Sequence, residues 1–188
     1  KIETVDKNGD GGVHKYSTDD RQILGHTNPD WIIGFSNSFT YKNFDLSLFV
    51  IGVHGFDIYN YTRAARLGVG DSPLELGPNP EWLNRWTPEN ENSDIAGFIS
   101  KRNSKKSASQ YVEKGDFVKV KSITLGYNFP ELIVKRMKIS TLRIYASIQN
   151  PFLFTGYSGI DPEVTLKSPL TSGIDYGYYP NGRNYLIG

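Results

Sequence analysis

The 188-residue sequence contains no cysteine, one methionine and three histidines, and its charges almost cancel. Without cysteine the chain can form neither a disulfide nor a thiolate metal site. Lys and Arg together number 21 against 20 Asp and Glu, so no nucleic-acid surface is indicated. No apolar run is long enough for a membrane-spanning helix, and no signal peptide is recognisable. Glycine, tyrosine and phenylalanine are abundant instead, at 19, 12 and 10 residues, as in strand-rich chains with many turns.

The length of the chain suits one domain with a sizeable core. Its first residue is not methionine, and residues 183–188 resemble the opening of a strand without room to finish. We therefore expect the sequence to be a fragment of a larger protein.

Alternating apolar and polar residues predict an antiparallel all-β fold. The clearest case is the stretch 139–149, where Leu142, Ile144, Ala146 and Ile148 alternate with polar or charged residues. The predicted strands are 31–41, 43–52, 116–129, 139–149 and 183–188, with a tight turn at residues 42–43 joining the first two.

Two folds accommodate strands with one apolar and one polar face. A soluble sandwich turns the apolar face to a core, whereas an outer-membrane barrel turns it to lipid and the polar face to a wet lumen. Lys119 and Lys121 share the face of Ile123, where a charge at mid-bilayer would cost about 2 to 4 kcal/mol. In a barrel, therefore, either these lysines lie beyond the hydrocarbon or a β-bulge swaps faces so that Val118 and Val120 point outward.

The connections between the predicted strands are very unequal in length. Residues 56–115 show no sustained alternation, apart from short helical possibilities at 58–67 and 80–86, and a second long loop is expected to open after Gln149. Connections in compact soluble domains are usually about 4 to 6 residues long. Short turns at one end and long loops at the other are typical of outer-membrane barrels.

Aromatic residues in the long connections are candidates for contact with a ligand or a partner protein. Trp82 and Trp86 lie four residues apart, so they would share a helical face and could stack on a sugar ring, pack on a partner or simply anchor the loop. The second loop is rich in tyrosine, and its candidates are Tyr157, Tyr178 and Tyr179.

An acidic stretch near the start of the chain is a candidate calcium loop. Asp6, Asn8 and Asp10 place side-chain oxygens at alternate positions before a glycine, as in a loop that wraps a hard cation. The twelfth position of such a loop, normally a bidentate acid, is a serine here, and Asp19 or Asp20 could replace it. The alternative is a set of Asn-Gly and Asp-Gly turns without metal.

An ordered series of motifs resembles the C-terminal part of SusC/RagA-type TonB-dependent outer-membrane transporters. The motifs are DKNGDGGV, the run from DDRQILGHTNPDW to GVHGFDIYN, WTPEN, YVEKGDFVKVKSITLGYNFP, ISTLRIYASIQNPFLFTGYSGIDPEV and GIDYGYYPNGRNYLIG. They cover nearly the whole chain.

The resemblance implies that the chain supplies the last strands of a 22-stranded transmembrane barrel with long extracellular loops, and that the plug domain is absent from it. Members of this family import oligosaccharides or peptides with a SusD-like surface lipoprotein as a lid, and TonB drives import through the N-terminal region. The candidate lumen-facing residues are Asp45, Ser47, Arg143, Tyr145 and Gln149. We therefore expect a transport function in the bacterial outer membrane.

The main alternative is a soluble, calcium-stabilised β-sandwich that binds carbohydrate through Trp82 and Trp86, with its apolar strand faces buried. An enzymatic function is not expected, because no two carboxylates are paired across a predicted cleft and the three histidines lack ligand spacing.

Overall fold

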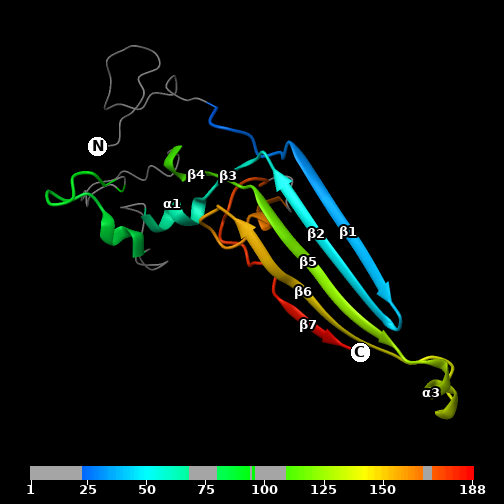
Figure 1. Ribbon diagram of the computed structural model, residues 1–188. Helices are drawn as coiled ribbons and strands as arrows, with labels where there is room; N and C mark the ends of the chain where they lie inside the picture. The colour runs from blue at the N-terminus through cyan, green and yellow to red at the C-terminus, as the bar shows by residue number, and fades with distance from the viewer. Residues whose placement is uncertain (1–22, 68–79, 94, 96–108, 167–170) are drawn as a thin grey trace. The chain divides into compact units, whose positions relative to one another are not determined.

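The computed structural model describes residues 23–67, 80–93, 95, 109–166 and 171–188 (Figure 1). Its main feature is a five-stranded antiparallel sheet with the strand order β1-β2-β5-β6-β7. The five strands are β1 (Trp31–Tyr41), β2 (Phe44–His54), β5 (Phe117–Asn128), β6 (Arg143–Thr155) and β7 (Asn184–Ile187). The antiparallel all-β prediction is thus confirmed at the level of this sheet.

The remaining elements are short. A two-stranded sheet pairs β3 (Asp57–Tyr59) with β4 (Val112–Lys114). The helices are α1 (Tyr61–Leu67) and α3 (Glu131–Arg136), and the 3-10 turns are η2 (Pro80–Asn84), η3 (Ser109–Tyr111) and η4 (Pro162–Leu166). None of the helices in these ranges is long and apolar enough to cross a membrane.

The chain divides into two compact units. The sheet unit comprises His26–Ile58, Glu113–Gly173 and Tyr178–Gly188, and the loop unit comprises Lys1–Gly25, Tyr59–Val112 and Ile174–Gly177. Each has its own small core. In the sheet unit Phe56 is fully buried, and its ring packs nearly perpendicular to that of Phe117, with centroids 6.5 Å apart. In the loop unit Ala64, Leu67 and Tyr111 are buried together.

The first hairpin has the predicted tight turn. Tyr41 pairs with Phe44, so only Lys42 and Asn43 lie between the strands, and Lys42 adopts a φ of 54°. Positive φ suits the two-residue turns that match strand twist. The Asn43 Nδ2 donates to the Asn128 carbonyl at 2.6 Å, which ties this turn to the end of β5. We call this end of the sheet, which also carries α3, the short-turn end.

A β-bulge in β5 swaps the faces, as one of the two sequence-based alternatives requires. Phe49 pairs with Ser122, but the next residue, Val50, pairs with Val120, so Lys121 is the extra residue. The bulge puts Val120 on the same face as Ile123 in spite of their odd separation. Val118 and Val120 therefore lie on the apolar face and Lys119 on the opposite one.

The bounds predicted for the fourth strand, 139–149, are wrong at both ends. β6 begins at Arg143, after a turn in which Lys138 has a φ of 56°, and it continues to Thr155. Asn150 and Pro151 resemble the start of a loop, but they are taken up as extra residues opposite the bulge of β5, where Val120 pairs with Phe152 and Ser122 with Gln149. Asn150 has a φ of 51°. Of the other four predicted strands, 31–41 matches β1 at both ends, and the remaining three differ from the observed bounds by one or two residues.

Candidate functional site

The five-stranded sheet exposes a continuous apolar face. Ile144, which the sequence placed outward, is 51% exposed, and no segment in the described part of the chain covers it. The other large exposed side chains of this face include Ile33, Phe35, Phe39, Tyr41, Phe44, Leu46, Val118, Leu125, Phe152, Phe154, Tyr185 and Ile187. A sandwich would bury this face under a second layer, so its exposure argues against the soluble module.

Asn37 is the one polar residue of β1 on this face. It pairs with Leu48, and its Oδ1 atom is buried without a hydrogen-bond partner among the described residues. β1 is an edge strand of the described sheet, so its neighbour there is only β2.

The opposite face carries an ion pair that crosses an entire strand. Arg143 of β6 donates from Nη2 to the Asp45 Oδ2 of β2 at 2.6 Å, and Asn128 of β5 donates to Asp45 Oδ1 at 3.1 Å. Gly126 lies on β5 between the two charged residues. A Cβ there would approach the Arg143 Nη2 to 2.5 Å and the Asp45 Oδ1 to 2.6 Å. Any larger residue at this position would therefore have to push the ends of these two side chains aside.

The other predicted lumen residues lie on the same polar face. Arg143 stacks 5.5 Å from the ring centroid of Tyr145. Gln149 accepts a hydrogen bond from Asn184 of β7 at 3.3 Å. Ser47 pairs with Thr124, whose hydroxyl lies 2.7 Å from that of a neighbouring serine on β6. All five predicted lumen residues thus share one polar surface, which we call the polar face.

At the other end of the sheet, the polar face is covered by residues 156–166, which we call the returning loop. Lys119 is 2% exposed, and its Nζ lies 2.7 Å from both the Asp161 Oδ2 and the Glu163 Oε2. Lys121 contacts the other oxygen of Glu163 at 2.5 Å, and Asn181 donates to the Glu163 Oε2 at 2.9 Å. Nothing in the local sequence pattern pointed to this network, because its members are about forty residues apart.

The charge balance of the network shows in the pKa of Glu163. Burial raises this pKa, but the hydrogen bonds and positive charges of Lys119 and Lys121 outweigh burial, so the pKa of Glu163 lies below its ordinary value. The two lysines of β5 therefore favour the ionised form of the Glu163 carboxylate.

The aromatic loop candidates do not form one group. Tyr157 is 5% exposed and packs with Phe56 and Phe117 in the core of the sheet unit, which leaves little of its ring for the predicted contact with substrate or lid. Tyr178 shares a hydrogen bond of 2.9 Å with the Thr171 hydroxyl. Tyr179 is 90% exposed. Only Tyr179 offers a largely free ring.

In the loop unit, the two predicted tryptophans behave differently. Trp82 packs partly buried against the small core of that unit, with the Arg85 guanidinium 4.2 Å from its ring centroid. Trp86 is 42% exposed, and its backbone N–H donates to the Ile95 carbonyl at 2.8 Å. The sequence analysis missed Tyr59, whose hydroxyl is buried without a partner in the described residues; burial raises its pKa to about 12.

The calcium prediction stays untested. Its residues, Asp6, Asn8, Asp10, Asp19 and Asp20, lie outside the described ranges. Within those ranges, no three His, Asp or Glu side chains are grouped so that they could hold a metal ion.

No family model matches the sequence. Curated relatives do: the chain is 37% identical over 190 residues to TonB-dependent receptor P3 of Formosa agariphila, covering 98% of this chain and 18% of that protein. It is 27% identical to the TonB-dependent receptor SusC of Bacteroides thetaiotaomicron, covering 98% of this chain and 17% of SusC. The chain thus spans less than a fifth of these relatives' length.

Solved structures share the fold. The RagAB peptide importer in its 'closed-closed' state superposes with a TM-score of 0.75 at 22% identity, covering 92% of this chain and 18% of that one. The 'open-open' state gives a TM-score of 0.76 at 23% identity, with the same coverage.

The sheet has one exposed apolar face and one polar face, and its strands are joined by connections of very unequal length. This is the architecture expected of a segment of a TonB-dependent receptor, and the homologues are receptors of that class. More narrowly, the chain is homologous over nearly its whole length to a segment of the SusC/RagA-type receptors, which are outer-membrane proteins. The predicted resemblance and outer-membrane location are confirmed.

Proposed function

We propose that the chain forms five strands of the closed barrel wall of a TonB-dependent transporter that imports oligosaccharides or peptides. The observation that carries this proposal is the sidedness of the sheet. A continuous apolar face suits contact with acyl chains, and the polar face behind it suits a wet lumen. The described β1 and β7 each pair on one side only. Unpaired strand edges are not tolerated in lipid, so further strands would complete the barrel, with 22 expected from the family.

The unequal connections set the proposed orientation. The short-turn end would face the periplasm, and the long connections would begin at the extracellular end. The exposed rings of Tyr179 and Trp86 would then be candidates for contact with a substrate or with a SusD-like surface lipoprotein that closes the barrel as a lid. TonB would act through the N-terminal region of the full-length transporter.

The polar face suits binding and passage rather than bond making. Asp45 and Arg143 neutralise each other, while Tyr145 and Gln149 offer a ring, a hydroxyl and an amide. Such groups can hydrogen-bond to sugar hydroxyls and to peptide amides alike. The homologues are receptors, and the RagAB structures are of a peptide importer, which fits a function in transport and not in catalysis.

The decisive experiment compares Leu48→Arg with Ser47→Arg in the full-length transporter. Leu48 lies on the apolar face and Ser47 on the polar face of the same strand. A lipid-facing arginine near mid-bilayer costs about 2 to 4 kcal/mol, whereas a lumen-facing one meets water. We expect Leu48→Arg to reduce heat-resistant, folded protein in the outer membrane strongly and Ser47→Arg to leave that amount unchanged while altering uptake.

Equal tolerance of both substitutions would contradict the proposed sidedness. Uptake of labelled oligosaccharide and peptide, each measured with and without TonB, separates the two substrate classes. Uptake that continues without TonB would contradict the proposed energy source.

A further inference from the structure

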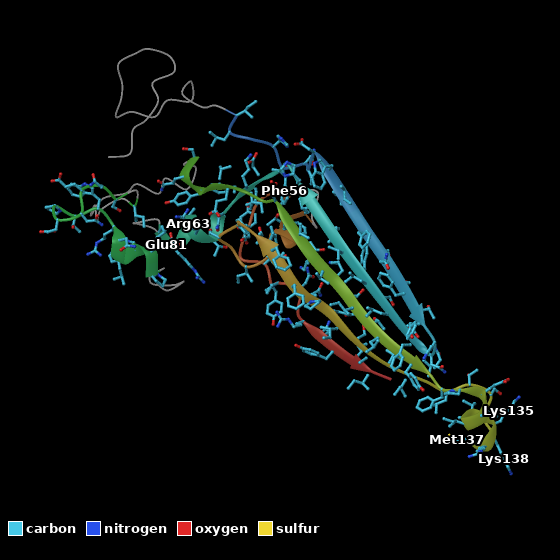
Figure 2. The ribbon with its side chains drawn as sticks, in the orientation of Figure 1. Phe56, Arg63, Glu81, Lys135, Met137 and Lys138 are labelled. Atoms are coloured by element: carbon cyan, nitrogen blue, oxygen red, sulfur yellow. The ribbon has the colours of Figure 1, made fainter. Side chains whose placement is uncertain are left out.

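The connection between β5 and β6 carries an unusual number of exposed apolar side chains. It contains α3, of which only Val134 is buried, at 2% exposure. Leu132 is 80% exposed and Met137 56%, and Ile133 and Ile139 are also exposed. Figure 2 shows Lys135, Met137 and Lys138 at the tip of this connection, beyond the ends of the strands. A connection in water alone would gain nothing from so many exposed apolar side chains.

Basic residues are interleaved with these apolar side chains. Lys135, Arg136 and Lys138 lie within four positions, and Glu131 is the one acidic residue between positions 130 and 140, which gives a net charge of +2. Lys135 is 3.4 Å from Glu131, and both are largely exposed. Lys42 of the neighbouring β1–β2 turn adds another positive charge at the same end of the sheet.

Aromatic rings precede this basic segment on the apolar face. Tyr127 packs 4.7 Å from Phe44 and 5.1 Å from Phe129, measured between ring centroids. Tyr41, at the end of β1, is 70% exposed. Rings at the ends of transmembrane strands lie at the boundary between acyl chains and headgroups. The residues that immediately follow, including α3, then lie at headgroup level.

We propose that residues 130–140 form an interfacial anchor that binds the anionic phospholipid headgroups of the leaflet at the short-turn end. Leu132 and Met137 would enter the boundary of the acyl chains, and Lys135, Arg136 and Lys138 would contact phosphates. This inference rests on the membrane orientation of the proposed function. A bilayer surface accepts apolar and basic side chains on one short helix, the apolar ones at the acyl boundary and the basic ones among the headgroups.

The test uses the full-length transporter, purified in detergent and titrated with phosphatidylglycerol or phosphatidylcholine while bound lipids are counted by native mass spectrometry. Each basic residue near an anionic surface contributes about a fivefold change in binding. Lys135→Gln/Lys138→Gln should weaken phosphatidylglycerol binding by about 25-fold and leave phosphatidylcholine binding unchanged. Leu132→Gln should weaken both.

The charge-preserving variant Lys135→Arg/Lys138→Arg is the matched control and should retain wild-type preference for phosphatidylglycerol. The inference would be overturned if the glutamine variant bound phosphatidylglycerol as well as the wild type does. It would also be overturned if that variant kept its lipid binding but lost a bound periplasmic protein, because the segment would then contact a protein and not lipid. Uptake and outer-membrane assembly are measured in parallel. If the glutamine variant keeps its uptake, its assembly and its lipid binding, only the proposal of a lipid anchor is refuted. If the wild type does not assemble in the outer membrane, the proposed function is refuted.

Discussion

The two ends of the sheet each carry an ion pair between an aspartate and a basic residue, in very different surroundings. Where the returning loop covers the sheet, the Lys119 and Asp161 side chains are each 3% exposed. Towards the short-turn end, the Arg143 and Asp45 side chains are 43% and 25% exposed. Each pair has a shortest contact of 2.6 to 2.7 Å. Contact distance alone therefore says little about what each pair contributes to stability.

The difference lies in what remains when one partner is removed. An exposed pair loses little, because water solvates the remaining charge, and such pairs contribute about 0.2 to 1 kcal/mol. A buried partner left alone keeps its desolvation cost without compensation. The end under the returning loop is thus built around a fixed network, whereas the other end presents hydrated charge to the proposed lumen.

The largest expected effect is that of Lys119→Met. This substitution keeps the volume of the side chain but leaves Asp161 and Glu163 without their shared cation, which should lower the free energy of unfolding by about 3 to 5 kcal/mol. Urea unfolding of the full-length protein reconstituted in lipid vesicles measures this loss. Lys138→Met, at an exposed position, is the control and, in vesicles of phosphatidylcholine alone, which offer its ammonium no anionic headgroup, should change stability by less than about 0.5 kcal/mol.

A loss below about 1 kcal/mol for Lys119→Met would mean that the network contributes no more than a surface pair. The contrast between the two ends would then not hold.

The second prediction concerns acid. The pKa of Glu163 lies below its ordinary value of 4.5, since the two lysines outweigh its burial. Its ionised form is therefore favoured by the fold, and this contribution is complete above pH 4.5 and is lost as the pH falls from there through the lowered pKa. Over that pH range the returning loop should detach from the sheet more often, which limited proteolysis measures as faster cleavage within residues 156–166.

Glu163→Gln should remove most of this pH dependence, because the amide cannot titrate. If the acid-induced loosening were the same in Glu163→Gln, another group would be responsible.

The third prediction tests the bulge that separates the two ends of β6. Asn150 has a φ of 51°, and its Nδ2 donates to the Gly182 carbonyl at 3.0 Å. Asn150→Val should cost about 1 to 3 kcal/mol, because a β-branched residue is strained in this conformation. Asn150→Gly removes the same hydrogen bond without the strain, so it should be clearly less destabilising in urea unfolding. Equal losses would assign the effect to the hydrogen bond.

Some of these features could be predicted from the sequence. Strand alternation placed Arg143, Tyr145 and Gln149 on one polar face, because the two-residue period within a strand is independent of tertiary contacts. The cost of a lysine on an apolar face also predicted the bulge in β5 as one of two solutions.

Other features required the fold. Asn150 and Pro151 are typical of turns, so local propensity ended the strand there, and only pairing with the bulged β5 extends it to Thr155. The contact between Lys119 and Asp161 spans 42 residues, which no local pattern encodes. For the same reason Tyr157 resembled an exposed recognition residue, although its ring packs with Phe56 and Phe117 in the core of the sheet unit.

The smallest expected effect is that of Gly126→Ala at the exposed pair. The new methyl group would overlap the Asp45 carboxylate and the Arg143 guanidinium, but both are ends of flexible side chains and can move apart into water. Unfolding should therefore become easier by at most about 1 kcal/mol, the contribution of an exposed pair. In an Asp45→Ala background, Gly126→Ala should cost much less, because the pair is already gone. An undiminished cost in that background would assign the glycine to backbone packing of β5 and would separate its role from the charges that cross it.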